Sequence, residues 1–269
     1  MRRGGSRLAP KGPRLPEPRI DEGITGGELD RSIRGQLRTL SKENAEGVAQ
    51  HLVMVGLRLA EENYDAALAH AETAVRRAGR VPAAREALGL VRYRMGDYAK
   101  ALSEFRAVRR LSGSQHVLPM MVDCERGLGR DDRALEMASS EDGRALKGAD
   151  ALELAIVVSG IRRDQGQSRA AALALQSLVR RAGARIDPRL AYAYAEALLA
   201  DGDSAGAREW FARAITADPD AATDAAERLE QIDGVVVVDL LDEDGDAPEG
   251  SSSAPPPAVP STDADDTRA

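Results

Sequence analysis

Apolar residues recur at helical spacing over residues 83–111, and one polar turn around Gly96 divides this stretch into two segments. After the turn, Tyr98, Ala101 and Phe105 follow one another at intervals of three and four residues. Such intervals place side chains on one face of a helix. The stretch therefore predicts two antiparallel helices joined by a short turn.

The same pattern recurs along the chain as an array of five copies. The turns fall at intervals of 34, 33, 37 and 36 residues. In every copy an alanine follows the turn by five residues, where two closely crossing helices leave room only for a methyl group. A core-sized side chain precedes each turn by eight residues. The turn positions are Glu62, Gly96, Gly129, Gly166 and Gly202; the alanines are Ala67, Ala101, Ala134, Ala171 and Ala207; the core-sized residues are Met54, Leu88, Met121, Val158 and Tyr194.

These residues give the chain a resemblance to a known repeat family. The second copy has Leu88 and Gly89 ahead of its turn and Tyr98 after it, and the fifth copy ends in Asp218 and Pro219. The pattern resembles the tetratricopeptide repeat (TPR), which has a period of 34 residues. An abundance of alanine and a preference for arginine over lysine resemble the short TPR proteins of high-G+C bacteria. The resemblance implies an all-α fold, a right-handed α-solenoid of about five helix pairs with capping helices and disordered tails.

The resemblance covers residues 40–218 and weakens in the third and fourth copies. Arg92 and Glu125 stand where the family usually has an aromatic residue, and the second helix of the third copy is cut short before Ser139. An irregular helical bundle is the alternative fold.

Charge and proline mark out the two ends of the chain. Residues 1–20 carry six basic side chains, one acid and four prolines, whereas residues 233–269 carry ten acids and one base. Neither composition favours a packed core. The tract of four valines that begins at residue 235 predicts either a strand that pairs with a partner or a segment that folds back onto the last helix. We expect a disordered basic leader over 1–26, a capping helix over 27–40, the repeat array over 41–218, a solvating helix over 219–232 and an acidic Ser/Pro-rich tail over 233–269.

Composition and motifs argue against several classes of protein. Aromatic residues make up only 3% of the chain and strand-like alternation is missing before residue 235, so a sheet-based catalytic fold is not expected. Cys124 and His116 lie eight residues apart, about 12 Å along a helix, too far to share a proton. The histidines form no metal spacing and no phosphate-binding loop is present. We therefore expect a protein that is not an enzyme and needs no cofactor and no metal. A single cysteine and the lack of an apolar run of 18 residues predict a cytoplasmic protein with no membrane partner.

Candidate contact residues follow from the resemblance, because in the TPR family the first helix of each pair builds the inner wall of the array. The mixture of arginines, acids, tyrosines and methionine favours a groove for a partner's peptide or helix, against the alternative of a solvated wall. The family's lysine-based clamp for a terminal carboxylate is missing. The inward-facing positions are Glu86, Leu90, Tyr93, Arg94, His116, Met120, Asp123, Arg126, Ile156, Gly160, Arg163, Asp164, Arg189, Tyr192 and Glu196.

Two classes of function fit these features. The first is a non-catalytic scaffold or adaptor that binds a segment of a protein partner in the groove. The second is a nucleic-acid or ribosome-associated factor that uses the basic leader and the arginine-rich faces. Phosphate contacts lose affinity steeply as salt rises, whereas a groove with apolar anchors retains it, so salt dependence distinguishes the two.

Overall fold

A computed structural model describes residues 16–183 and 185–234, which form thirteen α-helices, one 3₁₀ helix and no β-strand. The predicted all-α class is confirmed. None of the helices in these two ranges combines the length and the apolar character that crossing a bilayer requires. The valine tract, the rest of the acidic tail and the first 15 residues of the basic leader lie outside the described residues.

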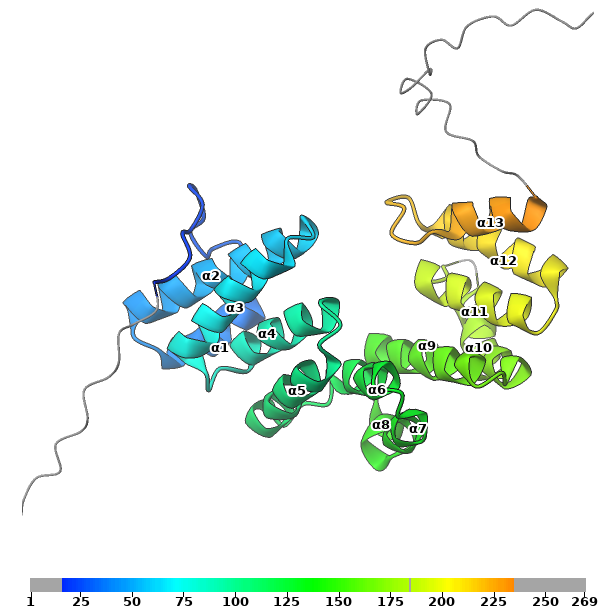
Figure 1. Ribbon diagram of the computed structural model, residues 1–269, viewed down its shortest axis with the longest axis horizontal. Coiled ribbons are helices and arrows are strands. Elements are labelled where there is room, and N and C mark those ends of the chain that lie inside the picture. Colours follow the sequence, from blue (N-terminus) through cyan, green and yellow to red (C-terminus); the bar gives the residue numbers. More distant parts are fainter. Residues whose placement is uncertain (1–15, 184, 235–269) are drawn as a thin grey trace, which may run out of the picture.

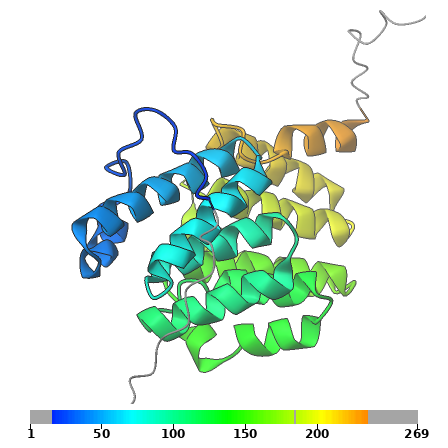
Figure 2. The same ribbon diagram turned by 60° about the vertical axis from the view of Figure 1, so that its left-hand side comes forward.

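The helices form five consecutive antiparallel pairs, which curve so that α4 and α11 lie on either side of α6 and α9 (Figure 1). Seen from another side, successive pairs stack one upon the next (Figure 2). The pairs are α2 (Lys42–Ala60) with α3 (Tyr64–Ala78), α4 (Pro82–Arg94) with α5 (Tyr98–Ser112), α6 (Leu118–Gly127) with α7 (Asp131–Ala138), α9 (Gly148–Asp164) with α10 (Ser168–Ala182), and α11 (Pro188–Ala200) with α12 (Ser204–Ala217). The short helices α1 (Arg31–Gln36) and η1 (Leu37–Thr39) precede the first pair, α8 (Glu141–Ala145) follows α7, and α13 (Ala225–Asp233) ends the stack.

The five predicted turns share one backbone conformation. The four glycine turns have φ between 68° and 88°, and Glu62 has a φ of 55°. This left-handed region is open to glycine at little cost and disfavours other residues. The periodic spacing read from the sequence thus corresponds to a real structural repeat, and glycine ends four of the five first helices for a conformational reason.

Tight crossings inside each pair explain the small residues that follow the turns. All five predicted alanines are fully buried. In the second pair, a Cβ added to Gly89 would come within 2.7 Å of the Phe105 ring, so the ring rests directly on the backbone of α4. In the fourth pair, Ser159 donates a hydrogen bond to the carbonyl of Ala171 at 3.2 Å. Small residues therefore set how closely the two helices of a pair approach.

The third pair is irregular. Its second helix, α7, has only 8 residues, and Ala134 is the one residue that it buries fully. Ser140 then accepts a hydrogen bond from the backbone nitrogen of Gly143 and starts the 5-residue helix α8. The first helix of this pair, α6, packs directly against α9, the first helix of the next pair.

Two ion-pair clusters replace aromatic residues in the second and third pairs. Glu125 is fully buried, and its carboxylate accepts hydrogen bonds from Arg106 at 3.1 Å and Arg130 at 3.3 Å. In the second pair, Arg92 approaches the mostly buried Glu104 at 3.4 Å. Charged pairs thus join neighbouring helices where the resemblance predicts aromatic packing.

Residues 17–24, within the stretch predicted as a leader, lie against the first helix pair. Glu17 accepts hydrogen bonds from Arg77 of α3 at 2.9 and 2.6 Å, and Asp21 pairs with Arg58 of α2 at 2.6 Å. The side-chain amide of Gln50 donates to the carbonyl of Ile24 at 3.0 Å. The basic character of residues 1–20 hid these acidic contacts, because one acid among six bases carries little weight in a composition.

Candidate functional site

The first helices α4, α6, α9 and α11 form an inner wall with two adjoining hollows. The wide hollow has a volume of about 530 Å³ and lies between all four of these helices. The narrow hollow has a volume of about 240 Å³ and lies between α6, α9, α11 and the connection to α13. Arg126, Ile156 and Arg189 line both of them, so the two hollows adjoin, and together they are called the groove here.

Most of the residues predicted to face inward line this groove. Glu86 and Asp164 do not, but each pairs with a residue that does, and the half-buried Leu90 belongs to neither lining. The predicted residues in the linings are Tyr93, Arg94, His116, Met120, Asp123, Arg126, Ile156, Gly160, Arg163, Arg189, Tyr192 and Glu196.

Several lining residues escaped the sequence analysis. Asp150 and Glu153 lie on the first turns of α9, ahead of Ile156, the first residue of this helix in the predicted set. Ala222 and Thr223 belong to the connection between α12 and α13, which no helical period describes. The remaining lining residues, such as Pro119, are direct sequence neighbours of predicted positions.

A chain of polar contacts crosses the wall from α4 to α9. The Tyr93 hydroxyl donates to one oxygen of Asp123, and Arg126 donates to the other at 3.2 Å. The Nε of Arg126 also donates to Asp164 at 2.6 Å. The guanidinium lies on the bare backbone of Gly160, where an added Cβ would come within 2.7 Å of it. Arg126 therefore ties the third repeat to the fourth at the groove surface.

A second set of ion pairs continues from α9 to α13. Arg163 donates to Glu196 of α11 at 2.6 Å, and Arg228 of α13 donates to the other oxygen of Glu196 at 2.7 Å. Arg189 of α11 reaches back to Glu153 of α9 at 2.6 Å. The predicted contact residues thus join neighbouring repeats to one another, which holds the groove in one shape.

The mouth of the wide hollow carries less constrained charge. Glu86 contacts the Nε2 of His116 at 3.0 Å, and the Oγ of Ser114 lies 2.8 Å from its Nδ1. Within the described part of the chain, Arg94 and Asp150 have no side-chain partner of opposite charge within 4.0 Å. A bound molecule can therefore contact these two side chains without breaking an existing ion pair.

Burial and contacts with carboxylates together set the protonation states inside the groove. Burial and the contact with Asp123 raise the pKa of Tyr93 above its ordinary value, so the phenol stays a hydrogen-bond donor at neutral pH. Burial alone would lower the pKa of Arg126, but the bonded carboxylates of Asp164 and Asp123 outweigh it and raise that pKa. Behind the wall, burial raises the pKa of Cys124 to about 12, which leaves an unreactive thiol.

Apolar side chains form the floor between these charges. Met120 of α6 and Ile156 of α9 are half-buried and line the wide hollow. Tyr192 of α11 lines the narrow hollow, and its ring packs edge-on against Phe211 with centroids 5.5 Å apart. The groove therefore offers apolar contact at its centre and charge along its sides.

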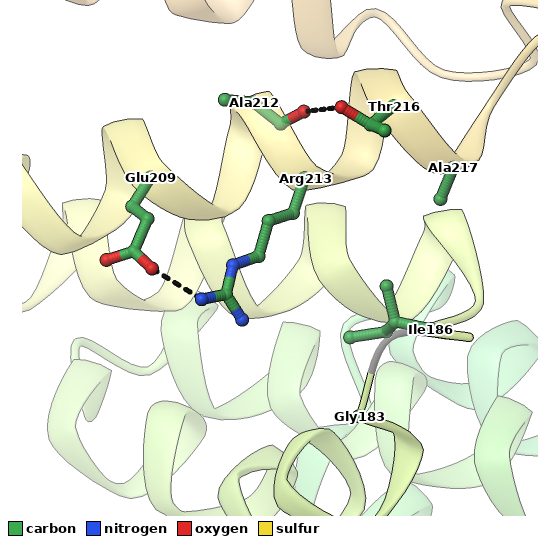
Figure 3. A pocket seen from close by; sticks show the side chains of 7 residues that line it. All are labelled: Gly183, Ile186, Glu209, Ala212, Arg213, Thr216 and Ala217. Atoms are coloured by element: carbon green, nitrogen blue, oxygen red, sulfur yellow. Dashed lines mark hydrogen bonds and ion pairs between the residues drawn. The ribbon is translucent and has the colours of Figure 1, made fainter.

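Another hollow of about 440 Å³ lies away from the inner wall, against α12 and the connection that precedes α11 (Figure 3). Glu209 and Arg213 of α12 pair with each other at 2.6 Å beside it, and the Arg213 guanidinium lies 4.3 Å from the centroid of the Trp210 ring. One helix satisfies its own charges here, and no group converges on this hollow from several repeats. We therefore place the candidate site on the inner wall.

Stacked antiparallel pairs with a buried alanine at each crossing and a shared inner wall define a helical-repeat solenoid. A tetratricopeptide-repeat family model matches residues 55–116 and 161–222. The helices of the irregular third repeat lie between these two stretches. These two stretches of the chain match the tetratricopeptide-repeat family, and the fold is that of a tetratricopeptide-repeat solenoid.

Solved structures with the same fold share little sequence with this chain. TTC0263, a thermophilic TPR protein in Thermus thermophilus, superposes with a TM-score of 0.58 at 19% identity, covering 69% of this chain and 98% of its own. PilF of Pseudomonas aeruginosa gives 0.52 at 14% identity, covering 72% and 87%. Human IFIT1, solved as a dimer with PPP-AAAA, gives 0.53 at 14% identity, covering 71% and 47%. Among curated proteins, none matches this sequence. The fold is in general a scaffold for protein–protein interaction and is generally not catalytic.

Proposed function

We propose that the protein is a non-catalytic adaptor that holds a segment of a protein partner in the groove of its inner wall. The observation that carries this proposal is that the two hollows adjoin along Arg126, Ile156 and Arg189 on the inner wall. Four first helices contribute to that surface, so a bound segment contacts several repeats at once. Short peptides and helices are bound by such elongated surfaces.

The chemistry of the groove supports a protein partner with one or more apolar anchors. Met120 and Ile156 provide the apolar contact that a partner's side chain needs to gain affinity by leaving water. Arg94 and Asp150, at the mouth, are placed to bind backbone or side-chain groups of either sign. Tyrosine and arginine are the residue types that most often dominate the energy of such interfaces.

The pairing of the arginines argues against the alternative of phosphate binding at this wall. Arg126, Arg163 and Arg189 each donate to a carboxylate within 2.6 Å. A phosphate backbone would have to displace these carboxylates or lie beside them, which costs electrostatic energy. A polypeptide segment, which is neutral along its backbone, does not meet this cost.

A photo-crosslinking experiment tests the proposal directly. The full chain carries a photoreactive phenylalanine analogue at position 120, on the groove floor, or at position 173, an outer site where Leu173 is 57% exposed. We expect the analogue at 120 to attach to one defined peptide of one partner, while that at 173 does not. The attached peptide is then synthesised, and its affinity is measured at two salt concentrations.

The outcomes separate the two functions. Attachment at position 120 to a peptide whose affinity changes little between low and high salt supports the groove. Attachment to nucleic acid, with affinity that falls steeply with salt, replaces the proposal with the phosphate-binding alternative. Equal attachment at positions 120 and 173 means that the groove confers no selectivity, and the proposal is then wrong.

A further inference from the structure

Two charges of opposite sign line the wide hollow without a partner of their own. Arg94 is the last residue of α4 and is exposed, whereas Asp150 lies in the first turn of α9 and is half-buried. In the described part of the chain, neither side chain has an opposite charge within 4.0 Å. Asp150 thus loses part of its hydration without gaining an ion pair, which costs free energy.

Contacts between the first helices place these two charges at opposite edges of the inner wall. Tyr93 near the end of α4 donates to Asp123 near the end of α6, and Arg126 of α6 donates to Asp164, the last residue of α9, at 2.6 Å. The carboxyl ends of α4, α6 and α9 are therefore level. The first turn of α9 lies about 21 Å back along the wall, because 14 residues at about 1.5 Å each separate Asp150 from Asp164.

The surface between the two edges is apolar at its floor and balanced in its other charges. Met120 and Ile156 are half-buried and line the hollow between the levels of the two unpaired groups. The remaining acids and arginines of the lining bond one another, Arg126 with Asp123 at 3.2 Å and Arg189 with Glu153 at 2.6 Å. A bound segment therefore meets one unpaired positive charge at the carboxyl edge and one unpaired negative charge at the amino edge.

We propose that the wide hollow binds a polypeptide segment in one direction, with an acidic side chain at Arg94, apolar side chains on Met120 and Ile156, and a basic side chain at Asp150. This inference rests on the proposed function and adds the charge order of the partner to it. End-for-end reversal of such a segment brings like charges together, which costs free energy, whereas the matched order compensates Asp150 for its lost hydration. Charge complementarity thus selects the direction, and the apolar floor supplies affinity.

The helix macrodipole also favours an arginine at the end of α4 and an aspartate at the start of α9, so the test needs a control for this effect. Arg110 is exposed in the last turn of α5, and Asp65 is exposed in the first turn of α3. These two residues have the same signs at the same helix ends but belong to second helices and line neither hollow. Reversing them alters the dipole interactions and leaves the groove unchanged.

A peptide-display selection on the full chain tests the charge order. The library holds random peptides of about 16 residues, long enough to span about 21 Å even as a helix. Each enriched peptide is tested again on Met120→Ala/Ile156→Ala, and only peptides that lose binding to this variant are kept. We expect the kept peptides to share an acidic and a basic residue on opposite sides of an apolar centre. One of them is synthesised together with a copy in which the acid and the base are exchanged.

Calorimetric titration with both peptides measures the preference. We expect the parent chain to bind the original at least about tenfold more tightly than the exchanged copy. Arg94→Asp/Asp150→Arg should prefer the exchanged copy, and Arg110→Asp/Asp65→Arg should behave as the parent does. If circular dichroism shows that the groove reversal does not fold, Arg94→Gln/Asp150→Asn takes its place and should bind the two peptides equally.

The outcomes separate this inference from the proposed function. If no enriched peptide depends on the groove floor, the groove holds no segment and both are wrong. If floor-dependent peptides show no common charge order, or the groove reversal keeps the preference of the parent, the charge order alone is wrong. An equal change of preference in the control variant also rejects it, because the discrimination then comes from helix ends outside the groove.

Discussion

At the residue scale, a charged residue at an aromatic position is the clearest departure of this chain from the tetratricopeptide-repeat pattern. Glu125 loses all contact with water, yet it keeps its charge partners Arg106 and Arg130 on α5 and at the start of α7. Both arginines are about half exposed, at 45% and 49%. The carboxylate is thus the group whose loss leaves a defect in the core, since the arginines can return to water.

We expect Glu125→Gln to lower the free energy of unfolding by about 1–3 kcal/mol, because an amide cannot satisfy two guanidinium groups at a buried site. Urea unfolding followed by circular dichroism measures the change. The matched control is Glu136→Gln on the exposed face of α7, expected to shift stability by less than about 0.5 kcal/mol. Equal midpoints for the two variants would show that the buried ion pairs contribute no more than surface charge.

Two helical glycines provide a matched test of the tight crossing in the second pair. Gly89→Ala pushes a methyl group into the Phe105 ring, which is fully buried, so we expect a loss of about 1–3 kcal/mol. Gly56→Ala in α2 meets no atom within 4 Å and should instead raise stability by about 0.5–1 kcal/mol. Thermal unfolding of both variants measures the two changes in stability. If both changes have the same sign, contact with the Phe105 ring is not what makes Gly89 necessary.

At the scale of the helix, the periodic features of the fold could be predicted from the sequence, whereas the contacts outside the repeat pattern could not. The turn spacing and the buried alanines located all five pairs, because a close crossing and a left-handed turn each demand particular small residues. The packing of residues 17–24 against the first helix pair could not be predicted, since Glu17 and Arg77 lie 60 positions apart in the chain. The inward phases located most of the groove for the same periodic reason. The inward phases could not show that Arg126 of the third repeat would bind Asp164 of the fourth.

The third repeat should be the weak joint of the stack. Residues 131–147 contribute little to the core, since Ala134 is the only buried residue of α7 and Gly143 the only one of α8. We expect their backbone amides to exchange with deuterium at least tenfold faster at pH 7 than those of α11 and α12, which belong to a continuous buried cluster. Mass spectrometry of proteolytic fragments measures both regions in one sample. Equal protection would mean that the short helix is held as firmly as the full-length ones.

At the scale of the whole molecule, the same ion pairs serve the stack and the groove. Arg126, Arg163 and Arg189 hold successive first helices in register, so removing one of them alters the shape of the groove as well as its chemistry. Tyr93 is half-buried and bonds Asp123, and its replacement by alanine has the same double effect. A clean test of binding therefore has to change the apolar floor and leave these pairs in place.

We expect the double variant Met120→Ala/Ile156→Ala to weaken capture of the partner segment by at least tenfold, about 1.4 kcal/mol, because alanine removes the apolar anchors. Calorimetric titration with the segment identified by crosslinking measures the affinity, and circular dichroism confirms that the stack remains folded. The matched control, Leu173→Ala/Ile215→Ala, removes apolar side chains that are 57% and 38% exposed on second helices, and it should bind normally. Suppose that the floor variant binds at full affinity while deletion of residues 235–269 releases the partner. Recognition then belongs to the acidic tail, and the inner wall serves only to build the stack.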